Sequence, residues 1–226
     1  MLQNNVNADV FSVPQKVTFT YNVVNSVTKA ISVGIFKPNE RLTEQSISEK
    51  VGVSRAPIRE ALKILYTQGL LVKGATTGYR VASFDQKTVK NVITARQSIE
   101  AILLQSAVEE WKRTDPKVIA LQKPISMMKS AAKTNDYFAS IEADLAFHKT
   151  IAMAGKNEFA VTLWDTISRH VLVILSLNNF RWNNLNAVVD HHEKFRDLII
   201  TKLESGFTGA DAHLAFENHF SDAWAN

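Results

Sequence analysis

The side chains best suited to metal chemistry are concentrated in the C-terminal part of the chain. All six histidines follow residue 147, and the first of them, His148, comes four residues after Asp144. Positions four apart project from one face of a helix, so a carboxylate oxygen and an imidazole nitrogen could bind one ion there. An Asp–His pair on a helix is more often an ordinary hydrogen bond, so the spacing alone leaves both interpretations open.

An enzyme is one function that such residues could serve. A metal-dependent hydrolase would use the Asp/His set to activate water, and Glu193, beside His192, is then the candidate general base. This alternative leaves the N-terminal third of the chain without a role. The chain has no cysteine, which excludes disulfides, thiolate zinc sites and cysteine nucleophiles and is typical of a cytoplasmic protein.

A second set of side chains could contact nucleic acid. Arg55, Arg59 and Lys63 follow one another at intervals of four, which aligns three cations along one face of a helix. Residues 1–84 hold ten Lys/Arg against five Asp/Glu, whereas residues 85–226 hold sixteen against seventeen. A local cationic excess suits a polyanion, because each neutralised phosphate releases counterions. A solvated cationic face is the alternative.

The cationic stripe lies within a helix-turn-helix pattern over residues 43–65. Ile47 and Val51 form the apolar face of the first helix, Gly52 stands where the turn favours a positive φ, and Ser54 is placed to cap the second helix. The buried face of the second helix is expected to consist of Ile58, Ala61, Leu62 and Leu65. A recognition helix enters the major groove, where arginine pairs with guanine edges or phosphates. The coincidence favours DNA contact.

Two strands, residues 70–73 and 79–82, are predicted to follow the second helix and to be joined by a glycine-containing tip. That arrangement is a winged helix, whose hairpin can reach the adjacent minor groove or the DNA backbone. The residues expected to contact DNA are Gln45, Ser54, Arg55, Arg59, Lys63, Thr77 and Gly78.

Few glycines or prolines interrupt the chain after residue 85, which favours long helices. Helices are predicted over residues 16–33, 43–51 and 54–68, and then, from apolar periodicity, over 86–111, 116–132, 135–154, 157–178, 186–204 and 210–223. The fold is expected to be mainly α. An N-terminal winged helix-turn-helix of three helices and a small β-hairpin (1–84) precedes an all-α antiparallel helical bundle (85–226). No apolar run approaches the roughly 18–20 residues of a membrane span, and no secretory signal is visible.

Residues 52–62 (GVSRAPIREAL) and 69–71 (GLL), with Pro38 and Leu42, closely resemble the GntR family of bacterial regulators. The resemblance covers about residues 20–82. It implies a homodimer on palindromic double-stranded operator DNA, with Arg55 and Arg59 as the main contacting arginines. Two positions depart from the family pattern. Asn39 stands where a glycine is usual, and Thr77 stands where the wing commonly has a basic residue, for which Lys73 and Arg80 are candidate substitutes.

Residues 136–157 resemble the FCD ligand-binding domain of the FadR branch of that family. Many FCD domains hold a divalent metal with one aspartate and three histidines, and the resemblance implies Asp144, His148, His192 and His219 as the ligands. Zn²⁺, Ni²⁺ and Mn²⁺ all suit such a set. His213 fits the usual separation from His192 better than His219 does, but it fits the local pattern worse. His191 is expected to be solvent-facing or outside the ligand shell, and His170 to be packed or to line a pocket.

Arg96 matches an arginine that many FCD domains direct into the pocket, where a guanidinium would clamp a small organic acid. A surface ion pair with Glu100, four residues on, is the alternative for Arg96. Together the resemblances imply a cytoplasmic transcriptional regulator, a repressor, with no membrane association. A small organic acid bound at the metal would modulate its affinity for the operator.

Overall fold

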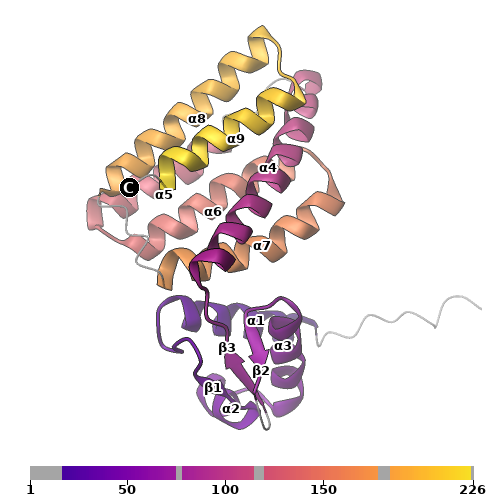
Figure 1. The fold of residues 1–226 in the computed structure, drawn as a ribbon, viewed down its shortest axis with the longest axis vertical. Coiled ribbons are helices and arrows are strands. Elements are labelled where there is room, and N and C mark those ends of the chain that lie inside the picture. The colour runs from indigo at the N-terminus through magenta and orange to yellow at the C-terminus, as the bar shows by residue number, and fades with distance from the viewer. Residues whose placement is uncertain (1–16, 75–77, 115–119, 178–183, 225–226) are drawn as a thin grey trace, which may run out of the picture. The chain divides into compact units, whose positions relative to one another are not determined.

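The computed structural model describes residues 17–74, 78–114, 120–177 and 184–224. Within these ranges it contains nine helices and a small three-stranded sheet (Figure 1). The chain packs as two compact units, one formed by the residues up to Ile31 together with Phe36–Ala82, the other by Ser32–Ile35 and Ser83 onward. The expected fold, a winged helix-turn-helix followed by a helical bundle, is confirmed.

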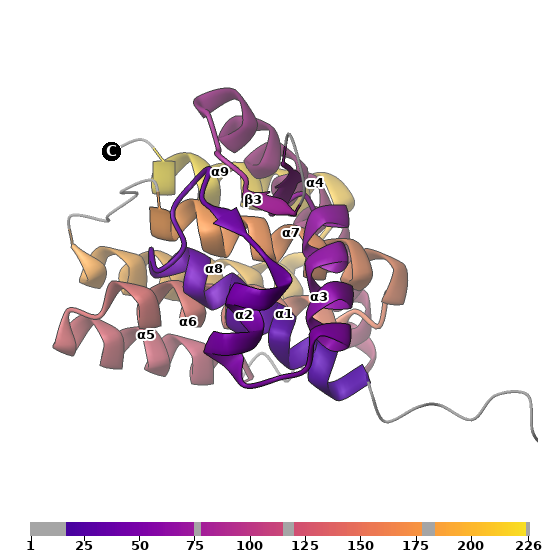
Figure 2. The same ribbon diagram turned by 90° about the horizontal axis from the view of Figure 1, so that it is seen from below.

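The first unit is built on three helices, α1 (Val17–Ser32), α2 (Glu44–Val51) and α3 (Arg55–Thr67), seen from below in Figure 2. The expected buried face of α3 is buried, as is Ile47 of α2. On α1 the buried apolar residues recur every three to four positions, as a helix with one face on the core requires. These are Val23, Val24, Val27 and Ile31.

The turn between α2 and α3 departs from expectation at its cap. Gly52 has φ 70° and ends α2 in the left-handed conformation, as predicted. Ser54 occupies the N-cap position of α3, but its side chain makes no capping hydrogen bond. Pro57 explains part of this, because a proline at the third helical position has no N–H to donate to the cap. Thr43 instead caps α2, accepting from the Ser46 backbone N–H at 3.1 Å.

The predicted hairpin is present as β2 (Leu71–Lys73) and β3 (Tyr79–Val81), with Leu71 opposite Val81. A strand that was not predicted, β1 (Arg41–Leu42), pairs with β3 and gives the order β1-β3-β2. Two residues are too few to show a strand's alternating pattern. Just before β1, Asn39 has φ 66°, a conformation that asparagine tolerates in place of glycine.

The second unit contains the six predicted helices. They are α4 (Gln86–Thr114), α5 (Gln122–Thr134), α6 (Tyr137–Ala154), α7 (Glu158–Leu177), α8 (Leu185–Ser205) and α9 (Gly209–Trp224). The helix predicted to begin at residue 116 corresponds to α5, which begins at Gln122; residues 116–119 lie outside the described residues, and residues 120–121 form a 3₁₀ turn. Pro124 lies in the first turn of α5, where proline is well tolerated, so proline marks the start better than apolar periodicity does.

The packing of this unit places a common core between five helices. α4 packs against α6 and α9, α5 against α6 and α8, and α8 against α9, as Figure 1 shows for α8, α9 and α4. The shared core includes Leu104, Phe147, Met128, Phe195 and Phe216, one from each helix. α7 packs against α4 and α6 through a separate apolar cluster centred on Trp164.

One stretch of α7 differs from the expectation about membrane spans. Glu158–Ser176 is long and apolar enough to cross a membrane by length and composition alone. Core helices of globular proteins pass the same test, so one such helix is weak evidence. Here 28% of the stretch is buried, including Val171 and Ile174, and it also contains the charged residues Asp165 and Arg169.

Candidate DNA-contacting surface and candidate metal centre

The cationic stripe of α3 lies on the surface of the first unit. Arg55, Arg59 and Lys63 are exposed, on the side of the helix away from its buried residues. Ser54 and Gln45 are exposed too, and the Gln45 amide donates a hydrogen bond to Glu49 at 3.0 Å. These side chains are therefore available to a ligand as large as duplex DNA.

The wing is described only in part. Gly78 is exposed and has φ 90°, and a side chain there would press on the carbonyl oxygen of Leu42. Thr77 lies outside the described residues. Of the two candidate substitutes, Arg80 donates to the carbonyl oxygen of Asn39 at 2.8 Å, and the Lys73 ammonium lies 5.5 Å from the centre of the Tyr66 ring.

Arg59 is held by a carboxylate that the sequence interpretation did not include. Its Nε and Nη2 atoms donate to the two oxygens of Glu44 at 2.7 and 2.9 Å. The hydrogen bonds from Arg59 lower the pKa of Glu44. Glu44 is the first residue of α2 and lies fifteen positions before Arg59, a separation that leaves no periodic signal that would have predicted the pair.

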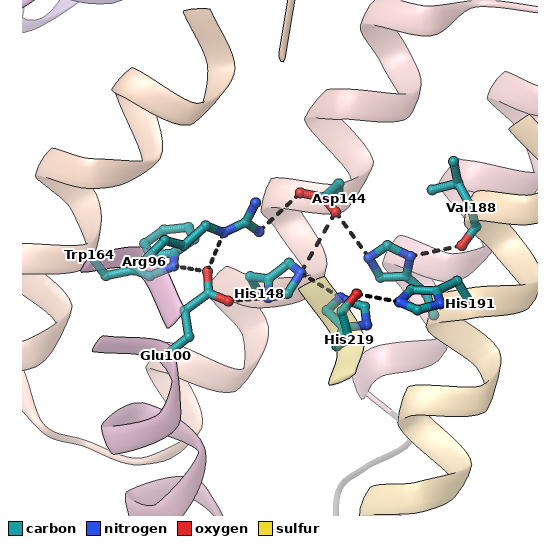
Figure 3. Close-up of polar contacts among 9 residues, drawn as sticks. Arg96, Glu100, Asp144, His148, Trp164, Val188, His191 and His219 are labelled. Atoms are coloured by element: carbon teal, nitrogen blue, oxygen red, sulfur yellow. Dashed lines mark hydrogen bonds and ion pairs between the residues drawn. The ribbon is translucent and has the colours of Figure 1, made fainter. Parts of the chain in front are cut away.

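The helical bundle brings the expected metal ligands together. Asp144 and His148 lie on α6, His192 on α8 and His219 on α9. All three histidines are buried, and one nitrogen of each lies within 4.8 Å of the others. Figure 3 shows Asp144, His148 and His219 facing one another. His213, the alternative to His219, is exposed.

Short distances connect these ligand atoms. Oδ1 of Asp144 lies 3.0 Å from Nε2 of His192 and 3.7 Å from Nε2 of His148. Nε2 of His148 lies 3.4 Å from Nε2 of His219. Atoms that share one ion at metal–nitrogen distances of about 2.0–2.1 Å are separated by comparable amounts.

The outer nitrogens of two rings are held by groups that can only accept a hydrogen bond. Nδ1 of His192 lies 2.8 Å from the carbonyl oxygen of Val188. Nδ1 of His148 lies 2.7 Å from Oε2 of Glu100. Each Nδ1 must therefore carry the hydrogen, and a neutral ring then presents the lone pair of Nε2 to the centre.

The atoms that face the centre, a carboxylate oxygen and ring nitrogens, therefore present lone pairs to one another at short range. Such an arrangement requires additional protons or a cation between them. The donor set of neutral imidazoles and one carboxylate is the kind that binds Zn²⁺, Ni²⁺ or Mn²⁺. The residues present thus fit a divalent metal.

The pKa shifts of two of the candidate ligands favour the protonation states that metal binding requires. Burial raises the pKa of Asp144, but Arg96 and the neighbouring histidines outweigh it and hold the pKa well below its ordinary value. Burial, together with His192 and His148, lowers the pKa of His219 far below that of a free imidazole. His219 is therefore neutral and Asp144 ionised, as metal binding requires.

His148 is the exception. Burial is the largest single influence and lowers its pKa, but the Glu100 and Asp144 carboxylates together outweigh it, so the net pKa lies above that of a free imidazole. A metal ion must displace the extra proton from this ring, which makes metal uptake less favourable in acid.

Arg96 is buried beside this centre and is not the surface residue of the alternative interpretation. Its Nε donates to Glu100 at 2.8 Å and its Nη2 to Asp144 at 3.1 Å. The guanidinium lies 4.6 Å from the centre of the Phe220 ring. The ion pair with Glu100 therefore exists, but it lies inside the protein and joins the arginine to a metal-ligand candidate.

The sequence interpretation missed the part that Glu100 and Trp164 play. The Trp164 indole donates to Oε1 of Glu100 at 2.8 Å. One signal was available in the sequence. The buried face of α4 repeats at spacings of three and four residues, and Arg96 and Glu100 lie on it. Its apolar members include Leu103, Leu104 and Ala107. A glutamate in such a stripe indicates a buried carboxylate with partners.

The two remaining histidines lie at different depths. Nε2 of His191 is 2.7 Å from the carbonyl oxygen of His219, and the two rings stack with their centres 4.4 Å apart. His191 thus contacts the ligand set from outside. His170 is half-buried on α7, with Nδ1 3.2 Å from the Thr166 carbonyl oxygen and its ring edge-on to Phe84.

Comparisons with known proteins match both units. Residues 20–81 match the bacterial regulatory proteins of the gntR family, and residues 91–215 match the FCD domain. An HTH-type transcriptional regulator of Bacillus subtilis, YdhC, is 31% identical over 82% of this chain and 83% of its own. The gluconate operon transcriptional repressor of the same organism is 26% identical over 75% of this chain and 70% of its own.

Solved structures share the fold. Escherichia coli McbR/YncC superimposes with a TM-score of 0.75 at 19% identity, covering 92% of this chain and 95% of that one. A GntR regulator from Rhodococcus sp. RHA1 has a TM-score of 0.71 at 19% identity, covering 92% and 96%. The matched families and the relatives from Bacillus subtilis are transcriptional regulators, so nothing supports the hydrolase alternative. Glu193, its candidate base, is paired with Lys129 at 2.8 Å. The chain belongs to the GntR family of DNA-binding bacterial transcriptional regulators, and its C-terminal helical unit is an FCD domain.

Proposed function

We propose that this regulator is a repressor whose affinity for operator DNA is changed by a small organic acid bound beside a divalent metal in the helical unit. The observation that carries the proposal is the convergence of Asp144 Oδ1 with the buried imidazoles of His148, His192 and His219. As a GntR protein of the FadR branch, it acts in the cytoplasm as a homodimer on a palindromic operator.

Asp144, His148, His192 and His219 would hold the metal, which is Zn²⁺, Ni²⁺ or Mn²⁺. A bound ion of this kind supplies a Lewis-acid position at which an effector carboxylate can bind. The rings of His148 and His192 are prepared for it, because their Nδ1 atoms are engaged by Glu100 and by the Val188 carbonyl. Ligands whose outer nitrogens are already held lose less freedom on binding a metal.

Arg96 is the residue proposed to hold the acid. Its Nε and Nη2 are engaged by Glu100 and Asp144, whereas Nη1 has no hydrogen-bond partner among the described residues. A buried guanidinium with donors to spare favours an anionic ligand, because a carboxylate would satisfy them. The repressor relative from Bacillus subtilis is named for a gluconate operon, and gluconate is itself a carboxylic acid.

DNA contact is proposed for Arg55, Arg59 and Lys63 of α3, together with Gln45, Ser54, Gly78 and Thr77, the last of which lies outside the described residues. The exposure of the three cations along one helix face supports this assignment. Arginines at the N-terminal end of a recognition helix would contact base edges, and Lys63 would contact phosphate.

Metal content tests the proposed centre. The purified protein, stripped of metal and then supplied with Zn²⁺, should retain about one ion per chain after dialysis, measured by plasma mass spectrometry. A variant with both His148→Ala and His192→Ala should retain almost none. A folded double variant that keeps the wild-type stoichiometry would refute the assignment.

A further inference from the structure

Glu100 is a fully buried carboxylate on α4 whose two oxygens serve three side chains from three helices. Oε1 accepts from Nε of Arg96 and from the indole N–H of Trp164, each at 2.8 Å. Oε2 lies 2.7 Å from Nδ1 of His148. Figure 3 shows Glu100 between the tryptophan and arginine on one side and the histidine on the other.

The contact with His148 determines which ring nitrogen can bind a metal. A carboxylate oxygen 2.7 Å from a ring nitrogen requires a hydrogen between them, because two lone pairs would repel at that distance. The 2.7 Å contact is an ion-pair contact and not an aligned hydrogen bond, and no described group gives Nδ1 of His148 a hydrogen bond of good geometry. In the neutral ring the proton therefore stays on Nδ1, and Nε2, which faces Asp144 and His219, keeps its lone pair.

We propose that Glu100 is a positioning residue of the metal centre: it keeps His148 in the Nδ1–H form and holds Arg96 against Asp144. The proposal rests on the proposed metal centre. Glu100 does not touch the ion itself and acts only through the residues that it holds. Partners of this kind orient metal-ligating histidines, and their loss typically weakens metal affinity about 10–100-fold.

Glu100→Gln is a sharp test because the two side chains have the same size. The glutamine must turn its single oxygen either toward Arg96 and Trp164 or toward His148. In the second orientation its NH₂ group would face two N–H donors, so the first is favoured. The NH₂ group then donates to Nδ1 of His148, and the ring proton must move to Nε2, the nitrogen that the metal needs.

The experiment is carried out on the full chain, first without metal. Nitrogen-15 NMR of the histidine rings, at a pH high enough to leave His148 neutral, should show Nδ1–H in the wild type and Nε2–H in Glu100→Gln. Zn²⁺ titration by calorimetry should then give an affinity about 10–100-fold weaker for the variant. A role in stability alone would lower the melting temperature and leave the ring proton where it is.

Two control variants isolate the effect. Glu110→Gln alters another ion-paired glutamate of α4, whose partner is Lys156 at 2.7 Å, and it should change neither the ring proton nor the Zn²⁺ affinity. Trp164→Phe removes one donor to Oε1 and leaves Oε2 in place, so His148 should stay in the Nδ1–H form. The same variant identifies which part of the tryptophan fluorescence comes from Trp164.

The outcomes separate the two proposals. Wild-type protein that binds no Zn²⁺ refutes the metal centre itself. Wild-type protein that binds Zn²⁺, together with a Glu100→Gln variant that binds it equally tightly, refutes the role of Glu100 alone. If the variant does not fold, the wild type still decides: a neutral His148 found in the Nε2–H form contradicts the proposal.

Discussion

At the scale of single residues, one arginine of the proposed DNA-contacting surface is already held in place by an ion pair. Glu44 occupies Nε and Nη2 of Arg59, which leaves Nη1 and the second hydrogen of Nη2 directed outward. That end-on edge can still form two hydrogen bonds to guanine. The ion pair therefore orients the guanidinium without consuming its capacity to recognise a base.

Arg59→Ala is expected to weaken binding to the preferred duplex about 5–150-fold, because a bidentate arginine–base contact is worth about 1–3 kcal/mol. Fluorescence anisotropy would measure this with a duplex that the wild type has selected from a random pool. Lys149→Ala is the matched control, because it removes an exposed cation from the helical unit. Unchanged affinity in Arg59→Ala would place the base-reading surface elsewhere.

Glu44→Gln should act in a different direction. Removing a negative charge from the surface that meets DNA should tighten binding to a random duplex, because repulsion of the phosphates is lost. Discrimination should fall, because Arg59 is no longer oriented. Fluorescence anisotropy with the selected and the scrambled duplex gives the ratio of the two affinities. An undiminished ratio would show that the ion pair has no part in specificity.

The sequence predicts residue types better than it predicts partners. Asp144 and His148 are recognisable because they lie four positions apart, and His192 and His219 because they match a known pattern. The pairs Glu44–Arg59 and Glu100–Trp164 join residues 15 and 64 positions apart, and only the fold brings such residues together. Long-range pairs of this kind leave no local periodicity in a single sequence.

At the scale of elements, the crossing of α4 and α6 is closer than most side chains would allow. A Cβ atom at Gly155 would lie 2.7 Å from Cβ of Ser106 and 2.8 Å from the backbone nitrogen of Ala107. The same two helices carry Glu100 and His148. The close approach of the backbones therefore helps to bring the buried glutamate within reach of the histidine.

Gly155→Ala should destabilise the protein by about 1–3 kcal/mol, because the added methyl group has no space and the helices must separate. Urea denaturation followed by circular dichroism would measure the loss. Met153→Ala, at an exposed position of the same helix, should change stability much less. Equal stability in wild type and Gly155→Ala would mean that the crossing relaxes without cost.

Elements with many residues are the ones that the sequence predicted well. Each of the predicted helices is present because several apolar positions repeat the same period. β1, with two residues, and the start of α5 were not foreseen, because neither contains enough residues to repeat a pattern. The expected capping hydrogen bond of α3 is absent for a different reason: Pro57 has no N–H to donate to Ser54.

At the scale of the whole molecule, the metal would join α6, α8 and α9 through ligands distant in sequence. A ligand that binds only the folded state raises its stability. Chelation should therefore lower the melting temperature of the wild type, and added Zn²⁺ should restore it. His192→Ala should melt at the same temperature with and without chelator. A wild type indifferent to both treatments would argue against a bound ion.

The central claim is that binding of a small organic acid beside the metal in the helical unit changes the affinity of the DNA-binding unit for its duplex. Its most direct test is the affinity for the selected duplex, measured with Zn²⁺-loaded protein in the presence of gluconate and other small mono- and dicarboxylic acids. Coupling between sites is typically worth about 1–3 kcal/mol, so an acid that binds should change the wild-type affinity about 5–150-fold. Arg96→Lys keeps the positive charge between Glu100 and Asp144 but lacks the fork. It should bind the duplex as the wild type does and lose most of the change in affinity caused by the acid. An Arg96→Lys protein whose affinity changes by the same factor would contradict the account. So would a wild type whose affinity is changed by none of the acids.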